Sequence, residues 1–245
     1  MNAQTPSFVA SAVAREPGAS TIARDCLVSS VSRAERTRTL LACGIIAGPV
    51  FLVVAIVQAL TRPGYDLARH PISMLSLGDL GWIQSANFIA SGVLMLAFAV
   101  GLRRLLRGGR GGTWGGALIG VFGAGLIVAG VFVPDPAWGF PLGAPDGIPS
   151  QLSWHAALHG VGFTLAFVGV SLACLVFARR SLARGERILA AYAVCSALIA
   201  LVLSGWPGTD GASVRYFVAA AIVWAWTVVL AVRLRRHVGR HATIC

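Results

Sequence analysis

Apolar residues are concentrated in six long stretches, which shorter polar segments separate. A helix rises about 1.5 Å per residue, so roughly 20 apolar residues are enough to cross the hydrocarbon core of a membrane. Each stretch is close to this length, and the pattern therefore predicts an all-α integral membrane protein, a six-helix bundle. The predicted spans are residues 40–60, 85–102, 114–133, 155–178, 188–204 and 214–232.

Two polar segments flank these spans. Residues 1–39 are rich in serine, contain proline and arginine, and lack the apolar core of a signal peptide. Such a composition predicts a disordered basic tail. The chain is therefore divided into a tail at 1–39, a transmembrane bundle at 40–232 and a second basic tail at 233–245.

Positive charge is unevenly distributed among the polar segments. All 20 basic residues other than histidine are arginines, and 17 of them lie in the two tails and in the segments after the second and fourth spans. The other three are Arg62, Arg69 and Arg215. Arginine-rich segments remain in the cytoplasm, so we expect a multi-pass protein of the bacterial inner (plasma) membrane with both termini cytoplasmic.

The composition supports the assignment to a membrane protein and argues against nucleic-acid binding. Hydrophobic residues make up 56% of the chain and charged residues only 12%, whereas a soluble domain carries about 25% charged residues. The pI of about 11.1 is that of many nucleic-acid-binding proteins. Because the arginines flank apolar spans, however, the expected partner is the lipid bilayer and not a nucleic acid.

The segment after the first span contains a distinctive motif. Residues 62–75 read RPGYDLARHPISML, and Gly81-Trp82-Ile83-Gln84 and Asn87-Phe88 follow. This motif resembles the signature of a bacterial and archaeal multi-pass membrane family catalogued as domain of unknown function 998, over about residues 40–232. The resemblance implies a membrane bundle, and it implies no established activity and no catalytic residues.

Most of the unusual polar residues fall at the predicted outer end of the bundle. They follow the first span, open the second, follow the third or open the fourth. Together they predict an outward-facing polar pocket that binds a small or lipid-like ligand. The candidate pocket residues are Arg69, His70, Ser73, Asn87, Asp135, His155 and His159.

Three of these residues could form a metal site. His155 and His159 are four residues apart and therefore share one face of a helix. With Asp135 as a third ligand they could hold zinc, which would activate water for hydrolysis of a lipid-borne bond. Haem is a further alternative for inward-facing histidines. The alternative to ligation is a structural role, in which both imidazoles are hydrated or hydrogen-bonded to a loop.

We expect an inner-membrane protein that is non-catalytic or of unassigned activity and that needs no cofactor. A metal-dependent membrane hydrolase is the alternative. A small transporter is a third hypothesis, weakened because no ionisable residue lies in the middle of a predicted span. The sequence assigns neither a particular ligand nor an oligomeric state.

Overall fold

The computed structural model describes residues 17–109, 111–207 and 211–241, with side chains described from residue 31 to residue 238 of these ranges. Six of its helices are long and apolar enough to cross a membrane, so the prediction of an all-α, six-span membrane bundle is confirmed. The elements are α1 (Pro17–Thr61), η1 (Ile72–Ser76), α2 (Gly81–Leu105), α3 (Gly112–Val131), α4 (Trp154–Leu182), α5 (Arg187–Gly205) and α6 (Ala212–His241).

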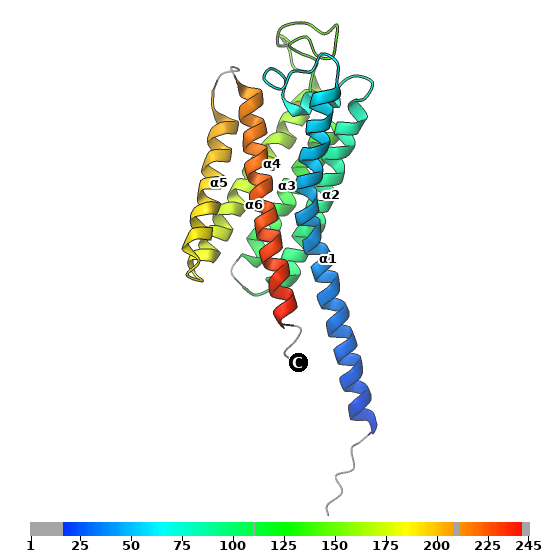
Figure 1. Ribbon diagram of the computed structural model, residues 1–245, viewed down its shortest axis with the longest axis vertical. Coiled ribbons are helices and arrows are strands. Elements are labelled where there is room, and N and C mark those ends of the chain that lie inside the picture. The colour runs from blue at the N-terminus through cyan, green and yellow to red at the C-terminus, as the bar shows by residue number, and fades with distance from the viewer. Residues whose placement is uncertain (1–16, 110, 208–210, 242–245) are drawn as a thin grey trace, which may run out of the picture.

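The six helices form a ring in chain order. Each helix packs on the next one in the sequence, and α6 returns to pack on α1 (Figure 1). The start of α1 and the end of α6 lie at the same end of the bundle (Figure 1). We call this the arginine end, because α2 and α4 also finish there with arginines in their last turns. The opposite, loop end carries residues 62–80 and 132–153.

One prediction at the amino terminus is wrong. Residues 17–39 belong to α1 and are helical, whereas the sequence was expected to be disordered up to residue 39. Ala23, Leu27, Val31 and Ala34 recur at helical spacing, and a helix that is already formed extends without a new nucleation cost. Residues 1–16 lie outside the described residues.

Glycines allow α2, α3 and α4 to approach closely. A Cβ built on Gly92 of α2 would lie 2.6 Å from the carbonyl oxygen of Gly123 of α3, and one on Gly123 would lie 2.8 Å from the oxygen of Gly92. Helices in lipid lack a strong hydrophobic driving force for association, so they depend on van der Waals contact. Small residues increase this contact because they let the two backbones approach closely. The close packing gives the loop end a rigid base.

Candidate functional site

Residues 62–80 and 134–147 fold together into a cap over the loop end. Its apolar centre is formed by Met74, Leu77, Ala137 and Phe140, which are all buried. The guanidinium carbon of Arg62 lies 5.6 Å from the centre of the Phe140 ring. The cap is therefore a packed structure with its own small core.

Arg62 holds the cap to the bundle. Its guanidinium group donates hydrogen bonds to the carbonyl oxygens of Leu75, at 3.1 Å, and Leu77. Burial lowers the pKa of Arg62, and the charge of Asp79 acts in the opposite direction. These two carbonyls lie in and just after η1, so Arg62 fixes η1 against the end of α1.

His70 joins the two halves of the cap. Its Nδ1 accepts a hydrogen bond from the backbone N–H of Asp66 at 2.9 Å, so the ring proton belongs on Nε2. Nε2 lies 3.0 Å from the carbonyl oxygen of Trp138 and donates to it. The Tyr65 hydroxyl donates to the carbonyl of His70 at 2.7 Å, and burial raises the pKa of Tyr65, as does the nearby charge of Asp66. Both imidazole nitrogens of His70 therefore serve the backbone.

Asp135 and His155 meet at the start of α4, with Ser153 between them. The Ser153 N–H and hydroxyl donate to the two carboxylate oxygens of Asp135, at 2.8 and 2.6 Å. Ser153 Oγ in turn accepts from the Ala156 N–H at 3.2 Å, which makes Ser153 the N-cap of the helix.

His155 donates from Nδ1 to this group. The nitrogen lies 3.1 Å from the carbonyl oxygen of Val133, 3.0 Å from Ser153 Oγ and 4.0 Å from Asp135 Oδ1. The Ser153 hydroxyl donates its hydrogen bond to Asp135 and not to His155. The arrangement therefore caps a helix and does not activate a serine nucleophile, which would need the histidine as base.

The charge of Asp135 is stabilised by this capping. Burial would raise the pKa of Asp135, but the hydrogen bonds from the Ser153 hydroxyl and N–H and the proximity of His155 lower it, and the net shift is downward. The carboxylate also lies at the amino-terminal end of α4, where the helix dipole favours negative charge.

His159 lies one turn deeper in α4 and points elsewhere. It is 8% exposed, and its Nδ1 lies 3.0 Å from the carbonyl oxygen of Ala129 and 2.8 Å from that of Phe132. Nδ1 must therefore carry the proton and donate to carbonyls at the end of α3, which have no partner within their own helix. This tautomer leaves Nε2 as an acceptor.

Buried amides tie α1 to α2 near the loop end. Gln84 Oε1 accepts from Gln58 Nε2 at 2.8 Å and from Asn87 Nδ2 at 3.3 Å, and Asn87 Nδ2 also donates to the carbonyl of Phe51 at 3.0 Å. Asn87 was a predicted pocket residue, but its amide bridges two helices. Gln58 was not among the candidates, because it lies within an apolar span.

The remaining two candidates occupy different positions. The side chain of Arg69 lies 3.8 Å from the carboxylate of Asp146, and the two side chains are 53% and 92% exposed. An ion pair this exposed contributes little to stability. Ser73 lies in η1 and faces a cavity inside the ring of helices.

This central cavity lies between side chains of α1, η1, α2, α3, α4 and α6 and is partly open to the surroundings. Its walls are mainly aromatic and aliphatic, and its polar groups are the side chains of Ser73, His159 and Tyr216. The lining residues are Phe51, Pro71, Ile72, Ser73, Phe88, Phe122, Leu126, Ala129, His159, Phe163, Ala166, Phe167, Val170, Tyr216, Ala220, Val223 and Trp224.

His159 is directed away from the other two proposed metal ligands. Asp135 and His155 share Ser153, whereas His159 donates to the end of α3. Within the part of the chain that the structure describes, no three histidine, cysteine, aspartate or glutamate side chains are grouped so that they could hold a metal ion. Ligation of zinc or haem remains a prediction from the sequence.

Comparison with known proteins gives one match. Residues 45–233 match the family described as protein of unknown function DUF998, in agreement with the range of about 40–232 that the sequence motif indicated. No curated protein and no solved structure matches the chain. The family match takes in all six apolar helices, and the chain therefore belongs to the DUF998 family of multi-pass membrane proteins.

Proposed function

We propose that this protein binds a lipid-like molecule with a hydroxyl headgroup in the central cavity. The observation that carries the proposal is the lining of the central cavity, which is mostly aromatic and aliphatic and includes three polar side chains. Small-molecule sites in proteins are usually concave, mostly apolar spaces with a few polar groups. The central cavity matches this description in its lining.

The polar groups specify the headgroup. The His159 tautomer leaves Nε2 as an acceptor, because Nδ1 donates to α3. Ser73 and Tyr216 add two hydroxyl groups, each of which can donate or accept. A ligand hydroxyl can donate to Nε2 and accept from one of these side chains. The surrounding aromatic walls suit a hydrocarbon chain.

We further propose that the protein lies in the bacterial inner membrane with both termini in the cytoplasm. The support is the distribution of arginines along the sequence, 17 of which belong to the two tails and to the segments after the second and fourth spans, and three to the other segments. The loop end would then face outward, and the polar groups of the cavity would lie near the outer leaflet. A ligand would enter from that leaflet.

The hydrolase and transporter hypotheses stay predictions from the sequence. Ser153 is engaged as a helix cap, and the predicted metal ligands have different partners among the described residues. Between the central cavity and the arginine end, Cys174 of α4 and Thr227 of α6 are both 0% exposed. No contact among the described residues therefore favours the hydrolase or the transporter hypothesis.

The experiment compares 1-dodecanol with dodecane, at equal mole fractions in lipid nanodiscs that contain the full chain. A ligand that binds only the folded state raises the unfolding temperature. We expect dodecanol to bind about tenfold more tightly than dodecane, which corresponds to one additional hydrogen bond. Equal stabilisation by both compounds would contradict the proposal.

Two variants of His159 separate the ligand's hydrogen bond from the structural one. In His159→Asn, the amide nitrogen can replace Nδ1 and keep the bonds to α3, but the acceptor at the Nε2 position is lost. We expect this variant to lose the preference for dodecanol. In His159→Gln, the amide group reaches the Nε2 position and the donor to α3 is lost. This variant should keep the preference but unfold at a lower temperature.

A further inference from the structure

A second pocket lies at the arginine end, between α4, α5 and α6, and is separate from the central cavity. It is partly open to the surroundings and is lined by three arginines, one histidine and one glutamate together with aromatic and aliphatic side chains. We propose that this pocket binds the headgroup and upper acyl chain of an anionic phospholipid, of which phosphatidylglycerol is the type.

The charge of the pocket favours an anion. Arg180 and Arg184 come from the end of α4 and the turn after it, and Arg233 comes from α6. With Glu186, these side chains leave a formal net charge of +2, and His237 adds to this charge when it is protonated. Guanidinium groups bind phosphate through paired hydrogen bonds, so a phosphodiester is the anion that this set suits best.

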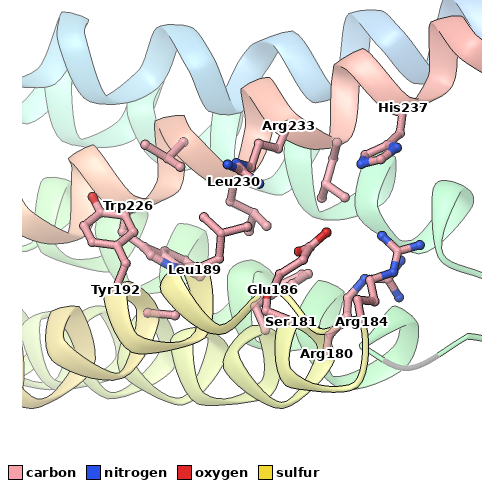
Figure 2. Close-up of a pocket in the computed structure, with 14 residues that line it drawn as sticks. Arg180, Ser181, Arg184, Glu186, Leu189, Tyr192, Trp226, Leu230, Arg233 and His237 are labelled. Carbon is pink, nitrogen blue, oxygen red and sulfur yellow. The ribbon is translucent and has the colours of Figure 1, made fainter.

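The shape of the pocket favours a lipid over a free anion. Figure 2 shows Arg184, Glu186 and His237 toward one end of the pocket, and Tyr192 and Trp226 toward the other. Trp226 and His237 are eleven residues apart on α6, so the pocket follows this helix for about 16 Å. Free phosphate would occupy the charged end alone, whereas a phospholipid also covers the apolar end.

Glu186 narrows the choice of headgroup. Its carboxylate is among the lining groups and points into the pocket in Figure 2. A carboxylate repels a bare phosphate but accepts hydrogen bonds from a hydroxyl group. A glycerol headgroup can place its phosphate on the arginines and its hydroxyl groups on Glu186. Basic pockets between membrane helices bind anionic headgroups in this manner.

The position of these arginines goes beyond what membrane orientation requires. Arg187, Arg235 and Arg236 are exposed at the same end and would serve orientation equally well, but they do not line the pocket. Arg233 lies two residues before Arg235 on the same helix. These neighbours provide matched controls, since each substitution removes one positive charge at the same end of the bundle.

The test titrates the purified full chain in detergent with phosphatidylglycerol, phosphatidylcholine or inorganic phosphate and counts bound lipid by native mass spectrometry. We expect Arg233→Gln and Arg184→Gln to weaken phosphatidylglycerol binding at least about tenfold, the effect of losing one charge-assisted hydrogen bond. Arg235→Gln and Arg187→Gln should leave binding unchanged. Unfolding temperatures without added lipid verify that all four variants are folded.

Three results would overturn the proposal. Phosphatidylcholine that binds as well as phosphatidylglycerol would exclude recognition of the net negative charge. Inorganic phosphate that displaces the lipid at equal concentration would assign the pocket to the free anion. Equal losses of phosphatidylglycerol binding in the lining and control variants would show that binding reflects only a general attraction between a basic surface and an anionic lipid.

Discussion

Gly125 of α3 and Gly162 of α4 lie back to back, so that neither position has room for a side chain. A Cβ on Gly125 would lie 2.7 Å from the carbonyl oxygen of Gly162, and a Cβ on Gly162 would lie 2.8 Å from that of Gly125. Both clashes involve backbone, which cannot move aside as a flexible side chain can. The contact sets the distance between α3 and α4, which carries His159 of the central cavity.

Gly162→Ala should therefore destabilise the bundle by about 1–3 kcal/mol, the usual cost of overpacking a well-packed interior. The control is Gly160→Ala on the same helix, where nothing lies within 4 Å of a built Cβ. Unfolding in a denaturing detergent measures both variants. A loss of stability in Gly160→Ala as large as that in Gly162→Ala would show that the close approach of the two helices does not determine the result.

The amide pair Gln58–Gln84 should show measurable coupling. Gln84→Leu leaves the buried Gln58 Nε2 without its 2.8 Å partner, although a longer bond to Val54 remains at 3.3 Å. Hydrogen bonds between membrane helices contribute about 0.6 kcal/mol on average and up to about 1.7. A double-mutant cycle with Gln58→Leu should give a value in this range. Additive single-variant effects would show that the bond does not stabilise the fold.

The cap of α4 should depend on pH through Asp135. Its folded-state pKa lies below the ordinary value of about 3.9, so its contribution is complete above that pH. The contribution is lost as the pH falls through the lower folded-state pKa. The difference in unfolding temperature between the native chain and Asp135→Asn should therefore shrink as the pH falls below about 4. A difference that grows on acidification would contradict the assigned shift.

His70 should stabilise the cap without affecting the membrane spans. His70→Ala removes the bond from Nε2 to the Trp138 carbonyl, which joins the two halves of the cap. We expect faster hydrogen exchange at the amides of Ala137, Gly139 and Phe140, which are bonded within that loop, and little change in the spans. Arg69→Gln is the control, since its exposed pair with Asp146 should contribute little. Equal acceleration in both variants would contradict the assignment of His70 as the residue that joins the two halves of the cap.

Much of the fold follows from hydropathy. Six apolar stretches predict six helices, because in lipid each stretch must hydrogen-bond its own backbone N–H and C=O groups. The extension of α1 back to Pro17 was missed, because serines and arginines outweighed a helical spacing of apolar residues that is visible in the sequence. The back-to-back glycines were also missed, since α3 contains many glycines and only the structure distinguishes the face toward α4.

The site was harder to predict than the fold. The sequence correctly indicated that His70, Asp135 and His159 lie toward one end of the bundle. Their roles have no sequence signature, because His70 and His159 bind carbonyl oxygens 68 and 30 residues away. Any residue type can supply a carbonyl. The arginines of the second pocket, Arg184 and Arg233, were interpreted only as signals of orientation, since nothing in their spacing shows that α4 and α6 face each other.

The most direct test of the central claim is quenching of Trp224, which lines the central cavity and is 2% exposed. A brominated dodecanol in nanodiscs should quench part of the tryptophan fluorescence. That part should disappear in Trp224→Phe and persist in Trp226→Phe, whose side chain lies outside this cavity. Ala220→Phe, which fills the cavity, should abolish it, whereas Ala221→Phe should not. Equal quenching of the native chain and Trp224→Phe would contradict ligand binding in the cavity.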